Sequence, residues 1–264
     1  MINGIDVSKW QGTIAWPEVA EDGVRFAMVR LGYGSKDGGG TLDPQFHQNV
    51  KGALAAGIDV GVYFYGGAVT EAAARSEAQF VLSALTPYRG KISYPVAYDT
   101  EDNAQGALSR SALTKLVAAF CNAIHEQKWY PMFYTSRSWL ENKLYPAEIP
   151  ADVWLAQWTE TATYRGEYGM WQHSDSGRVN GIKESVDLDM AYVDYPSKIR
   201  AGGYNGYGER DPYADVPEWG RESVRWAVEN GILKGGSDGL QLDADCTRLE
   251  MCVFLKRLYD LTQR

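Results

Sequence analysis

Acidic side chains stand at the ends of three predicted strands. They are Asp6, the pair Asp99 and Glu101, and Asp187 with its neighbour Asp189. Residues two apart in an extended chain point to the same face, about 6–7 Å apart, so Asp99 and Glu101 form a candidate pair. Hydrolysis of a glycosidic bond commonly uses two carboxyl groups, one of them an acid kept protonated by repulsion and burial. The pattern indicates glycoside hydrolysis; the alternative is that strand-end acids only cap helices or lie in solvent.

Other kinds of active site fit the sequence less well. Residues 235–239 match G-x-S-x-G, yet they lie between two predicted helices rather than at a strand-to-helix turn. Gly32 and Gly34 begin a dinucleotide motif that has Asp37 where its third glycine belongs. The three histidines form no H-E-x-x-H motif, and the acids lack the spacing of a calcium loop. We therefore predict neither a cofactor nor a metal site.

The composition is that of an acidic globular protein rich in aromatic residues. The 264 residues carry a formal net charge of -8. This argues against nucleic acid as a partner, because nucleic-acid-binding proteins cluster lysine and arginine against phosphates. The 9 tryptophans and 17 tyrosines either stack on sugars or fill a tyrosine-rich core. Three cysteines without a C-x-x-C pair exclude a disulfide scaffold and a structural zinc site.

Residues 1–195 alternate short apolar runs with amphipathic segments, of which 109–127 is the clearest. Eight strand candidates with helices between most of them predict an α/β fold, a TIM-like (β/α) barrel. Loops separate the last three candidates, so we expect the barrel to be irregular or incomplete. The eight runs are 4–7, 26–31, 59–65, 95–99, 131–135, 153–157, 170–173 and 186–190.

A second, smaller unit is predicted after the barrel. Residues 196–212 are rich in glycine and lack apolar periodicity, which indicates a linker. Residues 213–264 hold two predicted helices, 217–230 and 247–261. The unit is near the lower size limit for a self-sufficient core. We therefore expect it to pack on the barrel or on another copy of itself, the protein being otherwise a monomer.

The sequence contains neither a membrane span nor a signal peptide. No run approaches 18 apolar residues, so we do not expect a membrane protein. The first residues lack a basic region followed by an apolar stretch. We expect either synthesis in the cytoplasm without a signal peptide or a sequence that has been trimmed.

Several segments together carry a family resemblance. They are 4–12 (GIDVSKWQG), 43–46 (DPQF) with Asn49, 61–65 (GVYFY), 95–101 (PVAYDTE), 171–172 (WQ), 176–177 (SG) and 186–188 (VDL). In this order they resemble glycoside hydrolase family 25, the Chalaropsis-type lysozymes of bacteria, fungi and phage. The resemblance implies a flattened, irregular β/α barrel. It also implies cleavage of the β-1,4 bond between N-acetylmuramic acid and N-acetylglucosamine in peptidoglycan.

The resemblance implies roles for the acids and for several aromatic residues. Glu101 is expected to be the general acid and Asp99 its stabilising or orienting partner. Asp6 and Asp187 are expected to support the floor of the cleft. A direct aspartate nucleophile, inversion, and attack by the substrate's acetamido group remain alternatives. Tyr63 matches a family tyrosine at the cleft. Candidate sugar platforms, whose alternative role is barrel packing, are Trp10, Tyr33, Tyr98, Tyr134 and Trp158.

The C-terminal unit resembles a single S-layer homology repeat, on the segments 215–219 (DVPEW), 231–232 (GI), 238–239 (DG) and 247–250 (TRLE). It departs from the repeat at Gln241 and Asp243, where an aromatic residue and a proline are common, and it is one copy where three are usual. The resemblance implies binding of a secondary cell-wall polysaccharide, with Trp219 and Arg248 as candidate contacts. The alternative for Arg248 is an ion pair with Glu250 or a helix cap.

A lysozyme domain with a wall-binding tail resembles a phage or prophage endolysin, which reaches the wall through a holin-type membrane pore. Two other functions fit the sequence. One is a chitinase-like hydrolase of N-acetylglucosamine polymers. The other is a non-catalytic wall-binding protein, against which the presence of all four acids argues.

Overall fold

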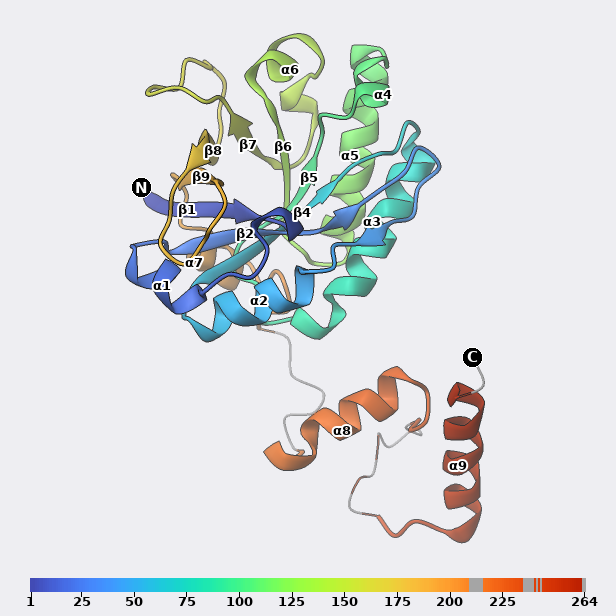
Figure 1. Cartoon of the computed structure of the whole chain (residues 1–264). Coiled ribbons are helices and arrows are strands. Elements are labelled where there is room, and N and C mark those ends of the chain that lie inside the picture. The colour runs from blue at the N-terminus through green and yellow to red at the C-terminus, as the bar shows by residue number, and fades with distance from the viewer. Residues whose placement is uncertain (209–215, 235–239, 241, 243, 263–264) are drawn as a thin grey trace. The chain divides into compact units, whose positions relative to one another are not determined.

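The chain divides into two units, Met1–Gly208 and Glu209–Arg264, which Figure 1 shows in the computed structural model. The structure describes residues 1–208, 216–234, 240, 242 and 244–262. Within these ranges, no helix has the length and apolar character needed to cross a membrane.

Within residues 1–208, eight strands close into a barrel-like sheet (Figure 1). Neighbouring strands from β1 through β2, β4, β5, β6 and β7 to β8 pair in parallel. The last strand, β9, lies antiparallel between β8 and β1 and completes the ring. The short β3 (Thr41–Leu42) pairs only with β2. The ring comprises β1 (Ile2–Val7), β2 (Phe26–Tyr33), β4 (Asp59–Tyr65), β5 (Val96–Asp99), β6 (Pro131–Ser136), β7 (Asp152–Ala156), β8 (Met170–Gly177) and β9 (Val186–Ala191).

The barrel interior is filled by the side chains that alternate inward along the strands. Phe26 and Met28 of β2 are fully buried there, and the Phe26 ring stacks on Tyr94 at 4.4 Å. Glycines on the flanking strands make room for them. A Cβ at Gly4 would lie 2.3 Å from the Phe26 ring, and one at Gly61 would lie 2.4 Å from the Met28 sulfur. Apolar side chains thus fill the amino-terminal part of the barrel and leave its carboxyl-terminal part to polar ones.

Helices cover the outside of the barrel between β2 and β6 (Figure 1). The helix α5 confirms the amphipathic segment predicted at 109–127. The Ser109 hydroxyl caps it by accepting the Ala112 N–H at 3.2 Å, which satisfies one of the free donors of the first turn. The helices of this unit are α1 (Trp16–Glu21), α2 (Phe46–Ala55), α3 (Glu71–Leu85), α4 (Asn103–Gly106), α5 (Arg110–Glu126), α6 (Arg137–Asn142) and α7 (Tyr195–Ala201), with 3-10 turns η1 (Lys9–Gln11), η2 (Thr86–Tyr88) and η3 (Pro146–Glu148).

The barrel is irregular along β7, β8 and β9. Loops at 157–169 and 178–185 join these strands in place of helices. The predicted eight-stranded irregular barrel is confirmed, whereas a regular TIM barrel, in which all eight strands run parallel, is not what this chain forms. Because β9 runs antiparallel, its first residues lie at the edge where the parallel strands end.

The predicted linker at 196–212 begins too early. Its first part is helix α7, in which Ile199 is fully buried. Asn205 is also fully buried, and its amide donates hydrogen bonds to the carbonyl oxygens of Ile92 and Tyr94, each at 3.0 Å. Residues up to 208 therefore belong to the barrel unit, while 209–212 lie outside the described residues. The glycine-rich composition did not reveal that residues 196–208 are ordered, because two buried side chains, Ile199 and Asn205, suffice to hold the segment on the barrel.

The second unit contains α8 (Glu218–Glu229) and α9 (Arg248–Thr262), close to the two predicted ranges. A reciprocal capping box begins α9. The Thr247 hydroxyl accepts the Glu250 N–H at 3.2 Å, and the Glu250 carboxylate accepts the Thr247 N–H at 2.8 Å. Parts of the predicted repeat, at 215, 238–239, Gln241 and Asp243, lie outside the described residues. Exposed large apolar side chains of the described helices are Trp219, Trp226, Leu249, Met251, Val253, Leu255, Leu258 and Tyr259.

Candidate active site

The four predicted acids meet in one cavity of about 100 Å³ at the carboxyl edge of the parallel strands. Asp99 ends β5 and Glu101 follows it, while Asp6 of β1 lies directly opposite Asp187 of β9 in the sheet. The antiparallel direction of β9 brings Asp187, its second residue, to this edge. The cavity is lined by Asp6, Tyr63, Asp99, Glu101, Tyr134, Trp154, Gln172 and Asp187.

The acids of the cavity floor are held in surroundings that favour their protonated forms. Asp6 is buried, and its Oδ2 accepts a hydrogen bond from the Gln172 amide at 2.7 Å. Burial raises the pKa of Asp6 well above its ordinary value, and the charges of Asp189 and Asp187 raise it further. Burial also raises the pKa of Asp189 to about 8, although the Trp154 indole donates to its Oδ1 at 2.8 Å. Asp189 therefore retains its proton near neutral pH, and the surroundings of Asp6 also favour its protonated form.

Asp99 and Glu101 differ in exposure and in hydrogen bonding. Asp99 is buried, and its Oδ1 has no hydrogen-bond partner among the described residues. Burial raises the pKa of Asp99 well above its ordinary value; the Glu101 charge adds to this effect and Arg30 opposes it. Glu101 has an exposed side chain, and its pKa is raised by desolvation, then by Asp187 and Asp102. The exposed acid can deliver a proton, while the enclosed one can hold a group of the substrate.

The amino-acid sequence matches a known family over most of the barrel. The sequence model of "Glycosyl hydrolases family 25" matches residues 5–182. The chain belongs to this family. A relative in Escherichia coli O157:H7, "Uncharacterized protein YegX", is 30% identical over 199 residues, which cover 72% of this chain and 69% of the relative. "Lysozyme M1" of Streptomyces globisporus is 26% identical over 70% of this chain and 66% of its own length.

Solved structures agree with the family assignment. The modular autolysin LytC from Streptococcus pneumoniae is 25% identical with a TM-score of 0.63, and the match covers 72% of this chain. The chain spans only 46% of LytC. The CTP1L endolysin matches with a TM-score of 0.65 over 100% of both chains, at 18% identity, and thus shares the fold.

Aromatic residues of this family 25 barrel surround the acids. Tyr134 lines the cavity, and its hydroxyl donates to Gln172 Oε1 at 2.9 Å. Tyr63 lines the same cavity and places its ring against the edge of Trp154, with 6.0 Å between ring centres. Trp158 is 56% exposed, and its indole N–H donates to the same Gln172 oxygen at 2.8 Å. The sequence analysis named all three residues as candidate sugar contacts, and their contact with sugar stays a prediction.

Tyr98 is not a sugar platform, contrary to the sequence prediction. Its side chain is fully buried and stacks on Phe120 of α5 at 4.2 Å, on the outer side of the sheet. Side chains alternate along a strand, so a residue next to the inward-facing Asp99 must point outward. The hydroxyl donates to Glu77 Oε2 at 2.6 Å.

Three residues at the site received no role from the sequence: Gln172, Trp154 and Asp189, the last of which was named only as the neighbour of Asp187. Gln172 links Asp6, Tyr134 and Trp158 through hydrogen bonds. It lies on a predicted strand, as Trp154 does, and it belongs to the WQ segment of the family resemblance, which implied no role for it. Asp189 shares the face of Asp187, two residues away, and this spacing was sufficient to suggest that it points inward.

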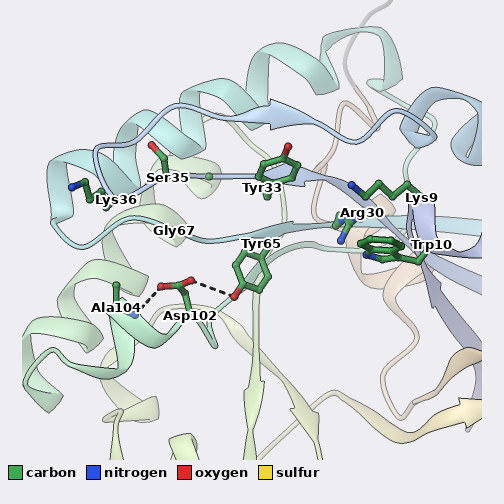
Figure 2. A pocket seen from close by; sticks show the side chains of 11 residues that line it. Lys9, Trp10, Arg30, Tyr33, Ser35, Lys36, Tyr65, Gly67, Asp102 and Ala104 are labelled. Atoms are coloured by element: carbon green, nitrogen blue, oxygen red, sulfur yellow. Dashed lines mark hydrogen bonds between the residues drawn. The ribbon is translucent and has the colours of Figure 1, made fainter.

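A larger side pocket of about 440 Å³ lies over the ends of β2 and β4 (Figure 2). It contains two predicted platforms, Trp10 and Tyr33, which are 68% and 41% exposed. Its Tyr65 lies opposite Asp99 in the pairing of β4 with β5, and its Asp102 directly follows Glu101, so the side pocket adjoins the acids. Its lining consists of Lys9, Trp10, Arg30, Tyr33, Gly34, Ser35, Lys36, Tyr65, Gly67, Asp102 and Ala104.

Proposed function

We propose that this protein is an N-acetylmuramidase that hydrolyses the β-1,4 bond between N-acetylmuramic acid and N-acetylglucosamine in peptidoglycan. The observation that carries the proposal is the meeting of Asp6, Asp99, Glu101 and Asp187 in one cavity. Family membership supports it. So does the resemblance to LytC, whose structure has been solved in complex with a synthetic peptidoglycan ligand.

In this proposal, Glu101 donates its proton to the glycosidic oxygen as the bond breaks. Its exposed side chain is open to the substrate, and its raised pKa favours the protonated form that a general acid needs. Asp99 holds the substrate through its unpartnered Oδ1, which suits a donor such as the N–H of a sugar acetamido group. Asp6 and Asp187 support this pair from the cavity floor, and Tyr63, Tyr134 and Trp158 contact the sugar rings.

Mass spectrometry of the products from purified peptidoglycan tests the proposal. We expect N-acetylmuramic acid at the new reducing end. A parallel digestion of chitin separates the chitinase-like alternative, for which soluble N-acetylglucosamine oligomers would be the main products. A matched digestion with Glu101→Gln identifies release that does not depend on the site. Lack of any new reducing end in peptidoglycan would contradict the muramidase assignment.

We further propose that the C-terminal unit binds a secondary cell-wall polysaccharide. Trp219, which is 89% exposed, is the contact that the described structure favours. Arg248 is also exposed, and its neighbour Glu250 is engaged by Thr247. Co-sedimentation of the full chain with walls, compared with Trp219→Ser and Arg248→Lys, tests this. Sedimentation of the chain alone tests the rival role, self-association through the exposed α9. We propose action on the wall after holin-type release, as for an endolysin.

A further inference from the structure

The side pocket carries positive charge, in contrast to the acid-lined cavity beside it. Lys9 and Lys36 lie toward opposite ends of it, with the Tyr33 ring between them and the Trp10 ring beside Lys9 (Figure 2). The Lys9 ammonium lies 4.7 Å above the Trp10 ring. Within the part of the chain that the structure describes, neither lysine forms an ion pair. Neutral sugar rings need only the aromatic faces, so two unpaired ammonium groups indicate an anionic ligand.

The third cation of the pocket, Arg30, is differently placed. Its guanidinium pairs with the buried Asp43, with an Nη2–Oδ2 distance of 2.7 Å, and Asp43 also accepts the Lys9 N–H at 3.1 Å. Through these two contacts, Asp43 ties the chain after β1 to β2. Arg30 therefore shapes the pocket, and the two lysines remain to bind a ligand.

A buried carboxylate fixes the far wall of the side pocket. Glu77 of α3 is fully buried, and its Oε1 accepts the N–H groups of Gly67 and Ala68 at 3.0 and 2.9 Å. The same oxygen lies so close to Gly34 that a Cβ there would be only 1.8 Å away. Glu77 thus holds together the segments that follow β2 and β4, which both line the pocket. A wall held in this way loses little conformational entropy when a ligand binds.

We propose that the side pocket binds the peptide stem of the substrate, with Lys36 and Lys9 pairing with stem carboxylates. The inference rests on the proposed muramidase function. In stem-bearing peptidoglycan the lactyl carboxyl of the muramic acid is consumed in the amide bond to the stem. The free carboxylates near the cleaved bond therefore belong to the peptide. A pocket that is lined by Asp102, the residue after Glu101, and that presents ammonium groups matches this substituent.

Kinetics on two forms of one substrate test the proposal. Soluble glycan strands, prepared free of wall phosphate polymers, are used with their stems and after amidase removal of the stems. The lactyl carboxylates that the amidase frees are then converted to amides, so that the stem-free strands carry no carboxylate. We expect a lower KM for the stem-bearing strands with the unaltered protein. Lys36→Met should raise the KM for these strands roughly threefold, as for loss of an exposed ion pair, so that the KM values of the two forms converge. The kcat on stem-bearing strands should change much less than KM.

Control variants and a chemical change of the substrate complete the test. Lys115→Met removes an equally exposed lysine of α5, outside the side pocket, and should leave the KM ratio unchanged. Conversion of the stem carboxylates to amides should reproduce the Lys36→Met effect with the unaltered protein. Equal KM values for both strand forms, or an equal rise on both with Lys36→Met, would overturn stem recognition while leaving the muramidase function standing. If neither form is cleaved, the proposed function itself is wrong.

Discussion

The barrel unit and the C-terminal unit bury their apolar residues to very different extents. In the barrel, Trp129 and Trp154 are each 1% exposed, whereas in the C-terminal unit Trp219 is 89% exposed and Leu249 is 75% exposed. The helices α5 and α9 show the same difference, because α5 buries an apolar stripe while α9 buries none of its side chains. Contiguous exposed apolar surface is characteristic of binding surfaces. The barrel unit thus buries its own apolar core, whereas the second unit leaves large apolar side chains for another surface to cover.

The difference in burial between the two units matches two separate proposed roles, catalysis for the barrel unit and wall binding for the C-terminal unit. The residues proposed for chemistry all lie in the barrel, and their geometry depends on strand pairing within it. The residues that line the cavity and the side pocket all belong to the unit Met1–Gly208. Changes in the barrel site should therefore abolish turnover on every substrate, and changes in the second unit should affect only action on intact walls.

The largest effect is expected for Glu101→Gln. Glutamine preserves the shape of the side chain but cannot donate the proton, so turnover should fall by at least ~100-fold. Reducing-end release from soluble glycan strands measures it. Glu126→Gln, an exposed change at the end of α5, is the matched control and should remain as active as the unaltered protein. Near-native turnover by Glu101→Gln would remove this residue from the role of general acid.

Asp99→Asn should impair turnover by at least ~10-fold while the barrel stays as stable or becomes more stable. The reason is that burial raises the pKa of Asp99, so that its charged form is unfavourable in the folded state. Turnover and thermal melting of one preparation measure both effects. Asp187→Asn should impair turnover similarly. Loss of turnover together with a lower melting temperature would instead mean that Asp99 mainly stabilises the fold.

The fold and the acid site were largely predictable from the sequence, and the reasons are local. Strand periodicity placed the eight ring strands, and two-residue spacing placed Asp99 and Glu101 on one face. Short patterns did not reveal the direction of β9, because an antiparallel strand has the same apolar alternation as a parallel one. The side pocket was also missed, since Lys36 lies in a loop and lines one pocket with Lys9 only because β1 and β2 pair in the sheet.

Stability of the barrel should decrease as the pH rises from about 4 to about 8. Asp189 has its pKa raised to about 8 in the folded protein, so over this range the folded state binds more protons than the unfolded state. The unfolding free energy therefore falls with increasing pH. Asp189→Asn should reduce the difference in melting temperature between pH 5 and pH 8 by roughly 5 °C. Asp194→Asn is the control, because burial does not raise the pKa of this exposed acid above its ordinary value. An unchanged pH dependence in Asp189→Asn would contradict a protonated cavity floor.

The smallest effect is expected from removal of the C-terminal unit. A chain ending at Gly208 keeps every residue of the cavity and the last buried anchor of the barrel, Asn205. It should fold and cleave soluble glycan strands within about twofold of the full chain. On intact walls its activity should fall roughly threefold to tenfold, because a second binding site raises the local concentration of enzyme at the polymer. Loss of turbidity of purified walls, measured in parallel with reducing-end release from soluble glycan strands, tests this prediction. Equal loss on both substrates would show that the second unit supports the barrel itself, and equal activity on walls would show that it contributes no binding there.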